Sequence, residues 1–324
     1  MQGLVTVFGG TGFIGRQVVR ALAKRGLRVR VAARNVGRGY RLRMLGDVGQ
    51  IEVAQANLRD DASVARALEG AQACVNLVGV LLEVGRQGFE SLHAEGAETV
   101  AKVCAAAGVQ RLVQMSAIGA DAQSDSKYAR TKAAGEAAAR AAFPGATIVR
   151  PSIVFGPEDD FFNRFGQMAA LSPALPLIGG GGTKFQPAYV ADVAEAIARI
   201  VEDPATAGQT YELGGPGVFT FKELMEFVLR ETGRRRALVP VPGAAAGLLG
   251  IAGDVAAAVY GFIPLVSPPV TSDQVKLLKV DNVATGAGFE ALGIVPKSIE
   301  AIVPSYLYRY RKGGQYAEAP QGAF

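Results

Sequence analysis

One stretch near the N-terminus decides the fold, Leu4-Val5-Thr6-Val7-Phe8-Gly9-Gly10-Thr11-Gly12-Phe13-Ile14-Gly15. Its first half is a short apolar run typical of a buried β-strand, and apolar residues at helical spacing follow the glycines. Glycines between a strand and a helix let the backbone turn tightly and approach a pyrophosphate, whose charge the helix N-terminus stabilises. The sequence therefore predicts a strand, a phosphate-binding turn and a helix, with the turn residues Gly9 to Gly15 as cofactor contacts.

The composition suits a folded protein with a large core. The 324 residues are 49% hydrophobic and carry a net charge of +5, without a long Lys/Arg run that would indicate a nucleic-acid tail. This mild basicity suits an anionic cofactor, an acidic partner or a membrane surface. Cys74 and Cys104 fit no metal-binding spacing, so we expect buried free thiols in a reducing compartment. The first strand leaves no room for a targeting peptide after Met1, and we expect a cytoplasmic protein.

Basic residues follow the second predicted strand, Val29 to Ala33. In NAD-binding folds an acidic residue about 20 positions after the glycines holds the ribose 2′-hydroxyl, whereas a basic residue suits the 2′-phosphate of NADPH. Arg34 and Asn35 occupy this position, with Arg38 close behind. The sequence therefore favours NADPH over NADH, and a solvated arginine loop is the simpler alternative.

Further candidate nucleotide contacts follow the third and fourth predicted strands. Asn57 and Leu58 come after the third strand, and Val78 and Gly79 come at the end of the fourth. The carboxyl ends of parallel strands face the ligand crevice of this fold class. We therefore expect these four residues to flank the adenine and the ribose.

The chain contains one histidine, His93, on a predicted helix from Phe89 to Ala107. A lone histidine on a helix is more often a surface or half-buried residue than a general base. One histidine also excludes a catalytic histidine triad and a multi-histidine metal site. We therefore expect no metal and no base at this position.

Three residues after the fifth predicted strand have the chemistry of a carbonyl reductase. The strand at 111–115 leads to Ser116, and Tyr128 and Lys132 are four positions apart, on one helical face. In such a site the serine binds a carbonyl oxygen and the phenol supplies a proton. The lysine makes the phenol more acidic while it contacts the ribose. We expect Ser116, Tyr128 and Lys132 to form this triad, or to serve only as cofactor contacts.

With these motifs the chain resembles the extended and atypical short-chain dehydrogenase/reductases. The glycine turn, the triad and the segment RPSIVFGPED (150–159) match that family, and the segment adds Pro151 and Ile153 to the expected cofactor contacts. One branch is more similar, the NADPH-binding accessory subunits of respiratory complex I, the proton-pumping NADH:ubiquinone oxidoreductase. Four segments carry this closer likeness: SKYARTKAAGE (126–136), AFPGATIVRPSIVFGPEDDFFNRF (142–165), FQPAYVADVAEAI (185–197) and VTSDQVKLL (270–278).

This resemblance implies a different use of the nucleotide from the one that the triad alone implies. In the accessory subunits the nucleotide is a bound structural ligand near the junction of the peripheral and membrane arms, not a substrate that turns over. The resemblance thus implies a protein that holds NADPH, contacts other complex I subunits and supports their assembly, peripherally at the cytoplasmic side of a bacterial inner membrane. Asn57 departs from the family pattern, because many extended members have aspartate there.

Two other functions stay open at the level of the sequence. The first is a free NADPH-dependent reductase or nucleotide-sugar epimerase that uses Tyr128 and Lys132, because the whole triad is present. The second is an NADPH-sensing regulatory module outside complex I. The similarity over nearly the full chain favours the accessory subunit, since fold alone cannot choose among these functions.

We expect an α/β protein, with a Rossmann-type doubly wound parallel sheet over residues 1–165. A helix within 185–205 returns to this domain, and a smaller C-terminal α/β docking lobe, with a strand at 211–213, covers 206–324. In that lobe Ala244 to Phe262 is long enough to cross a bilayer, but Asp254 near its middle argues against a span. We expect it to pack on a partner, to lie in the membrane interface, or to be a buried helix.

The run from Tyr306 to Lys312 alternates aromatic and basic side chains. Such side chains suit a headgroup region or the rim of a protein interface, because the rings can be buried while the cations stay hydrated. We expect this run at the edge of the docking surface.

Overall fold

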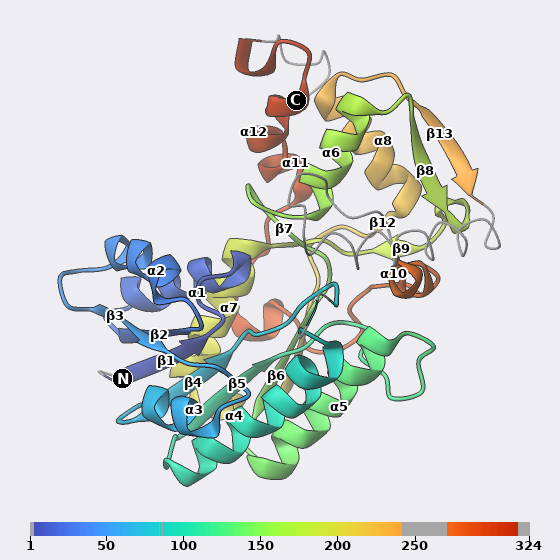
Figure 1. Ribbon diagram of the computed structural model, residues 1–324. Helices are drawn as coiled ribbons and strands as arrows, with labels where there is room; N and C mark the ends of the chain where they lie inside the picture. The colour runs from blue at the N-terminus through green and yellow to red at the C-terminus, as the bar shows by residue number, and fades with distance from the viewer. Residues whose placement is uncertain (1–2, 84, 86, 242–270, 317–324) are drawn as a thin grey trace. The chain divides into compact units, whose positions relative to one another are not determined.

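The computed structural model describes residues 3–83, 85, 87–241 and 271–316, and the chain in it forms two compact units (Figure 1). The first unit comprises Met1–Pro151, Val190–Leu213 and Thr285–Val295. The second comprises Ser152–Tyr189, Gly214–Ala284 and Pro296–Phe324. Each unit is therefore built from three separate stretches of sequence.

A seven-stranded parallel sheet is the centre of the first unit, in the order β11-β6-β5-β4-β1-β2-β3. Pairing in register joins β1 to both β2 and β4, so the chain reverses its direction of winding between β1 and β4. This arrangement confirms the predicted doubly wound sheet, whose ligand crevice lies at that reversal. The strands are β1 (Leu4–Phe8), β2 (Arg28–Ala33), β3 (Ile51–Gln55), β4 (Ala73–Asn76), β5 (Arg111–Met115), β6 (Thr147–Pro151) and β11 (Thr210–Leu213).

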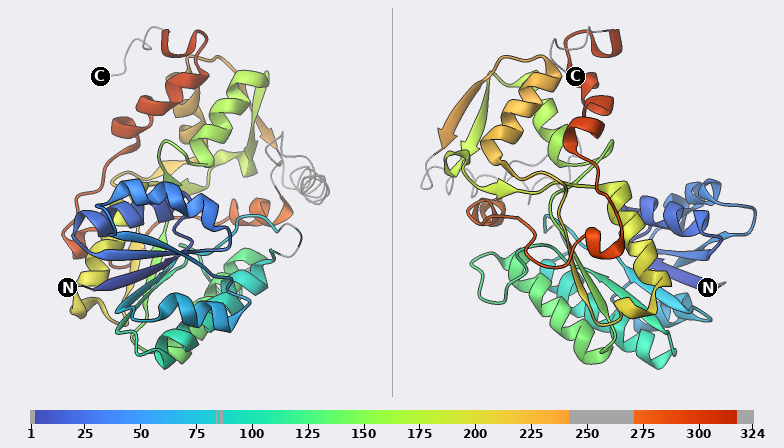
Figure 2. Two further views of the ribbon diagram at one scale, coloured as in Figure 1. Left: turned by 60° about the vertical axis from the view of Figure 1, so that its left-hand side comes forward. Right: turned by 180° about the vertical axis from the view of Figure 1, so that it is seen from behind.

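Helices cover both faces of this sheet (Figures 1 and 2). On one face α1 packs against α7, and on the other α3, α4 and α5 pack in succession. The helix α1 ends at Lys24, shortly before Gly26, whose φ of +75° is a left-handed conformation that favours glycine. The helical segments of this unit are α1 (Phe13–Lys24), α2 (Val36–Gly39), η1 (Tyr40–Leu45), α3 (Asp61–Leu68), η2 (Glu90–Ala94), α4 (Glu95–Ala106), α5 (Lys127–Ala142), α7 (Val190–Glu202), η4 (Pro204–Thr206) and η5 (Glu290–Leu292).

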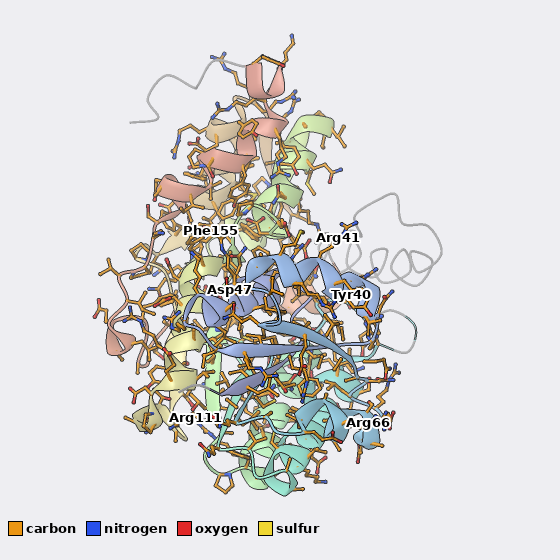
Figure 3. The ribbon with its side chains drawn as sticks, turned by 90° about the vertical axis from the view of Figure 1, so that its left-hand side faces the viewer. Tyr40, Arg41, Asp47, Arg66, Arg111 and Phe155 are labelled. Atoms are coloured by element: carbon orange, nitrogen blue, oxygen red, sulfur yellow. The ribbon has the colours of Figure 1, made fainter. Side chains whose placement is uncertain are left out.

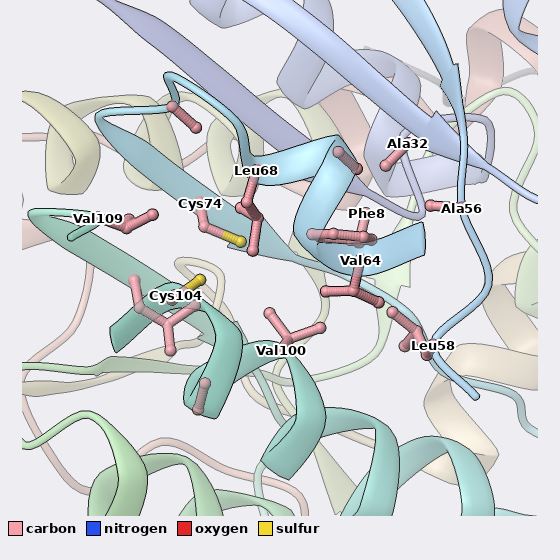
Figure 4. Packing of buried hydrophobic residues seen from close by; sticks show 14 of the residues in the cluster. Phe8, Ala32, Ala56, Leu58, Val64, Leu68, Cys74, Val100, Cys104 and Val109 are labelled. Carbon is pink, nitrogen blue, oxygen red and sulfur yellow. The ribbon is translucent and has the colours of Figure 1, made fainter. Parts of the chain in front are cut away.

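The core between the sheet and α3 and α4 contains both cysteines. Cys74 on β4 and Cys104 on α4 are free thiols, fully buried among aliphatic side chains such as Leu68 and Val100 (Figure 4). Burial raises the pKa of the Cys74 thiol well above its usual value, so the thiol stays protonated and unreactive. This confirms the expectation of two buried free thiols.

The second unit packs two helices, α6 and α8, against a two-stranded parallel ribbon of β8 and β13. The helix α8 begins with a capping box, in which the Thr220 hydroxyl accepts from the Glu223 N–H and the Glu223 carboxylate accepts from the Thr220 N–H. Phenylalanine side chains from α6 and α8 fill the core between them. The elements are β7 (Val154–Phe155), α6 (Phe161–Leu171), β8 (Ala174–Ile178), η3 (Gly179–Gly181), β9 (Lys184–Phe185), β10 (Ala188–Tyr189), β12 (Phe219–Thr220), α8 (Phe221–Thr232), β13 (Ala237–Val241), α10 (Ser272–Leu277), α11 (Ile299–Ile302), α12 (Pro304–Leu307), η6 (Tyr308–Tyr310) and η7 (Gly314–Tyr316).

Two sequence expectations differ from the structure. The strand at 211–213 is present, but it pairs with β6 at the edge of the first sheet instead of lying in the C-terminal lobe, because its alternating Tyr211 and Leu213 are buried there. Residues 152–165, expected in the Rossmann domain, belong to the second unit.

The run from Tyr306 to Lys312 is only partly a surface feature. The aromatic ring of Tyr306 is buried in the core of the second unit, and its hydroxyl donates to a carboxylate oxygen of Asp159 at 2.6 Å. Asp159 is buried too, and its oxygens also accept from the backbone amides of Gly156 and Asn163. The expectation of a rim position is therefore wrong for Tyr306, which anchors the C-terminal helices to the turn before α6.

The apolar segment from Ala244 to Phe262 lies outside the described residues. Among the helices that the structure does describe, none combines the length and the apolar character needed for a transmembrane span.

We predict that Tyr306→Phe lowers the free energy of unfolding by about 1–3 kcal/mol, because the buried Asp159 carboxylate loses a hydrogen-bond donor. Urea denaturation measures this loss. Tyr308→Phe is the matched control, because Tyr308 lies two positions away with 37% of its surface exposed. Equal unfolding midpoints for the two variants would contradict the anchoring role of Tyr306.

Candidate functional site

The predicted phosphate turn is present, and two of its glycines are sterically required. Gly9 has φ +78°, and a Cβ there would lie 3.1 Å from the carbonyl carbon of Leu77. A Cβ on Gly15 would lie 2.2 Å from the Gly9 oxygen, so α1 packs directly on the turn. The Gly12 N–H donates to that oxygen at 3.0 Å, and α1 begins at Phe13 with no side chain capping its N-terminus. The turn therefore fits an anionic group such as a pyrophosphate at the start of α1.

A cavity of about 230 Å³ lies beside this turn, around the carboxyl ends of the first four strands. Small-molecule pockets commonly measure roughly 300–1,000 Å³, so this cavity suits one half of a dinucleotide. Eight predicted contacts line it: Gly9, Thr11, Gly12, Arg34, Asn57, Leu58, Val78 and Gly79. The sequence analysis missed eight further lining residues: Phe8, Ala32, Ala33, Ala56, Leu77, Val80, Gln87 and Leu92.

Other predicted residues do not line this cavity. Their roles as cofactor or catalytic residues stay predictions, and one of them, Ile153, belongs to the second unit. The group comprises Gly10, Phe13, Ile14, Gly15, Asn35, Ser116, Tyr128, Lys132, Pro151 and Ile153.

The two residues after β2 have different local roles. Arg34 is exposed at the cavity, and its guanidinium donates to the side-chain oxygen of Gln87 at 3.1 Å. This amide holds no charge, so the Arg34 cation stays available to an anionic ligand. Asn35 instead caps the short helix α2, because its side-chain oxygen accepts from the Gly37 N–H at 3.0 Å. Arg34 therefore lines the cavity, whereas Asn35 stabilises the N-terminus of α2.

Tyr128 and Lys132 lie together on the first turns of α5. The Ser126 hydroxyl caps this helix by accepting from the Ala129 N–H. One turn separates the two side chains, and the Lys132 Nζ lies 5.7 Å from the centre of the Tyr128 ring. The structure therefore brings together the tyrosine and the lysine of the predicted triad.

Burial shifts the pKa values of both groups. It raises the pKa of Tyr128 to about 12, so the phenol is protonated at neutral pH. It lowers the pKa of Lys132 to about 8, and the nearby Glu136 carboxylate opposes this shift. Lys132 is therefore mainly a cation at neutral pH, beside a phenol that can donate a hydrogen bond.

Glu136 is itself fixed by a nearly buried ion pair. Two parallel hydrogen bonds, 2.8 and 2.6 Å long, join the Arg150 guanidinium on β6 to the Glu136 carboxylate on α5. The same guanidinium donates to Glu212 on β11 at 3.3 Å. This network ties the helix that carries Tyr128 and Lys132 to the edge of the sheet.

Ser116 follows β5, and its hydroxyl is buried. Within the described residues this hydroxyl has no hydrogen-bond partner. A buried hydroxyl without a partner is uncommon in folded proteins, because its desolvation is not compensated. A ligand oxygen could accept a hydrogen bond from this hydroxyl. The missing partner therefore fits the predicted role of Ser116, which is to bind a carbonyl oxygen.

His93 was expected on the surface or half-buried, but the structure buries it with 2% exposure. It lies in a π-helical turn, η2, where it stacks on Phe89 at 5.4 Å and meets the Tyr128 ring edge-on at 5.3 Å. The Val80 N–H donates to its Nε2 at 3.1 Å, and its Nδ1 lies 3.2 Å from the Thr131 hydroxyl. The helical pattern could not show this burial, because the π-turn rotates the residue relative to a regular helix.

These contacts define the protonation state of His93. Burial and, less strongly, the Lys132 cation lower its pKa to about 3, so the ring is neutral at neutral pH. Because Nε2 accepts from Val80, we assign the ring proton to Nδ1, which then donates to Thr131. His93 thus connects the cavity loop at Val80 to the helix α5 without adding a charge beside Lys132.

Comparisons with known proteins agree with this architecture. The sequence profile described as the NAD dependent epimerase/dehydratase family matches residues 5–214. The chain is 38% identical over 321 residues to the Arabidopsis thaliana NADH dehydrogenase (ubiquinone) 1 alpha subcomplex subunit 9, covering 97% of this chain and 80% of that protein. It is 32% identical over 241 residues to a Caulobacter vibrioides ceramide reductase, covering 74% of each chain.

The solved structures show a similar fold. An NADPH-dependent quinone oxidoreductase from Escherichia coli, complexed with NADPH, matches with a TM-score of 0.74 and 21% identity, covering 94% of this chain and 99% of that one. At this identity the likeness concerns the fold alone.

We predict that His93 makes the stability depend on pH. The unfolded chain has a histidine pKa near 6.5, and the folded value is about 3. Between these values the unfolded state binds one proton more, so the native chain loses stability as the pH falls below 6.5. The loss should be about 1.4 kcal/mol per pH unit relative to His93→Gln, whose side chain does not titrate. Urea denaturation of both proteins at several pH values measures it.

Because His93 is the only histidine of the chain, nitrogen NMR of histidine-labelled protein observes it without overlap. The neutral Nδ1–H form should persist at mildly acidic pH. An ordinary titration near pH 6.5, or parallel stability curves for the two proteins, would show that the ring is not buried as described.

Proposed function

We propose that this chain, which belongs to the NAD dependent epimerase/dehydratase family and to its branch of NADH dehydrogenase alpha subcomplex subunit 9 proteins, is an accessory subunit of respiratory complex I. In this role it holds NADPH as a structural ligand. The observation that carries the proposal is the extent of the relationship, 97% of this chain, which includes the second unit. The fold alone does not choose the function, because a solved quinone oxidoreductase also covers 94% of this chain, at only 21% identity.

The site supports a nicotinamide nucleotide, and NADPH is the form that its charge favours. The turn at Gly9 to Gly15 would hold the pyrophosphate, and Arg34 would pair with the 2′-phosphate. When bound, the nucleotide can supply a hydride to an acceptor. Lys132 and Tyr128 would fix its ribose, and Ser116 offers its orphaned hydroxyl to a ligand oxygen.

The weak acidity of Tyr128 favours a site that retains NADPH over a site that oxidises it. A general acid works best when its pKa lies near the operating pH. Burial raises the pKa of Tyr128 to about 12. With this pKa the phenol donates a hydrogen bond readily but gives up its proton poorly.

The second unit is the part that we assign to docking on other complex I subunits, at the cytoplasmic membrane surface. Four arginines at the end of α8 and after it, and three cations at 309–312, make this region basic. Arg309 and Lys312 are exposed, whereas Arg311 reaches the backbone oxygen of Glu231. Exposed cations here suit an acidic partner or anionic headgroups.

A second candidate function is a free NADPH-dependent reductase. The specific observation in its favour is the 32% identity to the Caulobacter ceramide reductase, together with the intact triad. A free reductase would oxidise NADPH steadily with a carbonyl substrate, and an accessory subunit would not.

We predict that the native chain binds NADPH more tightly than NADH, because Arg34 can pair with the 2′-phosphate. A charged hydrogen bond contributes about 1.5–3 kcal/mol, so Arg34→Asp should weaken NADPH binding at least tenfold. Calorimetry with both nucleotides measures the preference. Arg66→Asp is the control, since Arg66 is exposed on α3 and does not line the cavity. Equal affinities of the native chain for the two nucleotides would refute the proposed selectivity.

The purified chain should oxidise NADPH only at the background rate when it is offered aldehydes, ketones, quinones or oxidised ceramides. The physical reason is the weak acidity of Tyr128. Absorbance at the NADPH band follows the reaction. Robust turnover that disappears in Tyr128→Phe would instead establish the reductase.

Full-length tagged protein should co-migrate with complex I subunits after extraction of membranes with a gentle detergent. Mass spectrometry of the complexes separated by native electrophoresis identifies them. Gly15→Val is a useful comparison, because its side chain would collide with the turn and remove the nucleotide site. We expect less of this variant in the complex, since a ligand that binds only the folded state stabilises it. A native chain that migrates alone would contradict the proposal.

A further inference from the structure

The positive charge of the chain is concentrated in one segment of the first unit. Residues 11–50 hold ten of the 34 Lys and Arg residues but one of the 29 Asp and Glu residues. This segment therefore carries a net charge of +9, and the other 284 residues together carry −4. A nucleotide phosphate beside Arg34 would offset only a small part of this excess.

Two of these cations are neutralised within the unit. Arg25 pairs with Glu195 at 2.5 Å and with Glu202 at 3.0 Å on the neighbouring helix α7. Arg30 pairs with Glu52 on β3. These three carboxylates are thus already paired with cations of the segment.

Among the residues that the structure describes, seven exposed cations of this segment have no carboxylate within 4.0 Å: Arg20, Lys24, Arg28, Arg34, Arg38, Arg41 and Arg43. Arg20 and Lys24 are one turn apart on the outer side of α1. Arg38 and Arg41 belong to α2 and η1, and η1 packs against α1.

Large apolar side chains stand among these cations. Tyr40 is 49% exposed and Met44 is 82% exposed, both on η1, while Leu42 between them is buried and anchors the segment. The Arg43 guanidinium lies 4.8 Å from the centre of the Tyr40 ring and holds it in place. Figure 3 shows Tyr40 and Arg41 on this segment, away from Arg66 on α3.

The backbone beneath these side chains is firmly held. A Cβ on Gly39 would lie 2.5 Å from a methyl group of Val53, so α2 packs closely on β3. The Gln50 amide donates to the backbone oxygens of Ala23 and Leu27, which joins the loop after η1 to the end of α1. We call the set Arg20, Lys24, Arg38, Tyr40, Arg41 and Met44 the arginine-methionine surface.

We propose that the arginine-methionine surface docks on an acidic protein surface of a neighbouring complex I subunit. This inference rests on the proposed function and adds the chemistry and the position of one contact. A partner that supplies carboxylates to these cations and covers Tyr40 and Met44 would satisfy both features of the surface. A backbone that is already held in place also lowers the entropic cost of such an association.

The residue types favour a protein over a lipid headgroup or a nucleic acid. Nine of the ten cations in residues 11–50 are arginine. Protein interfaces are enriched in Arg, Tyr and Met and depleted in Lys, whereas anionic lipids attract Lys and Arg alike. A phosphate backbone would leave the apolar side chain of Met44 uncovered, whereas a protein surface can cover it.

The arginine-methionine surface follows the cavity directly along the chain. Arg34 lines the cavity, the next residue caps α2, and Arg38 follows on that helix. A nucleotide held by Arg34 would therefore fix the first residue of the segment that carries the surface. The bound nucleotide would thus have a structural role in docking, and this role does not require turnover.

Charge reversal tests the contact in the full-length chain. Arg41→Glu and Met44→Glu place a negative charge on the surface, and Arg66→Glu makes the same change as Arg41→Glu on α3. We expect the first two variants to bind NADPH like the native chain by calorimetry, but to co-migrate with complex I at least tenfold less. Arg66→Glu should behave as the native chain in both measurements.

A photocrosslinking residue in place of Tyr40 then identifies what lies opposite. It should capture an Asp- or Glu-bearing peptide of a complex I subunit, and exchange of those acids for Lys should restore the assembly of Arg41→Glu. Co-migration of Arg41→Glu at the level of Arg66→Glu overturns this inference alone. Capture of lipid or nucleic acid, or of no subunit peptide, overturns it as well. A native chain that does not associate with complex I overturns the proposed function together with it.

Discussion

The contact between the Gly9 carbonyl and the backbone of Gly15 is the constraint on which the rest of this structure depends. No side chain fits between the turn and the first helix, because a Cβ on Gly15 would lie 2.2 Å from the Gly9 oxygen. This close approach sets the start of α1 against the end of β1, at the place where the sheet reverses its winding. The cavity, the phosphate turn and the orientation of β2 all follow from it.

The polar groups beside the cavity form a site that holds a ligand without needing to exchange protons. A neutral His93, a cationic Lys132 and a protonated Tyr128 lie in contact. Burial favours the neutral forms of His93 and Tyr128, whereas Lys132, with a pKa of about 8, keeps its charge at neutral pH. His93 connects the cavity loop to α5 by hydrogen bonds and adds no charge. Within the described residues the buried Ser116 hydroxyl has no hydrogen-bond partner, and a ligand oxygen can satisfy it. Such a site stabilises the protein most when it is occupied.

The sequence predicted those parts of this structure that depend on local chemistry. The apolar run and the glycine spacing predicted the strand, turn and helix at the start of the first unit, and β5 (Arg111–Met115) has the predicted bounds. The charge of Arg34 and the spacing of Tyr128 and Lys132 identified side chains that the structure places at the cavity or together on one helix.

Features that depend on distant partners could not be predicted in this way. The burial of His93 depends on a π-helical turn and on Val80, thirteen positions earlier. The strand at 211–213 joins the first sheet because β6 has a free edge, and Tyr306 is buried because Asp159 accepts its hydroxyl. Alanine and leucine at strand ends line the cavity without any signal in the sequence. The burial and the strand pairing of these residues depend on contacts with residues far away in the sequence, which residue type alone does not show.

The central claim is that a nicotinamide nucleotide is retained as a structural ligand while the surrounding assembly works. The most direct measurement is the nucleotide content of purified complex I that contains this chain, before and after sustained NADH oxidation. The account predicts one NADPH per chain, still reduced and not exchanged for labelled NADPH in the medium. Conversion to NADP⁺ during turnover, or complex that contains the chain but no nucleotide, would contradict it.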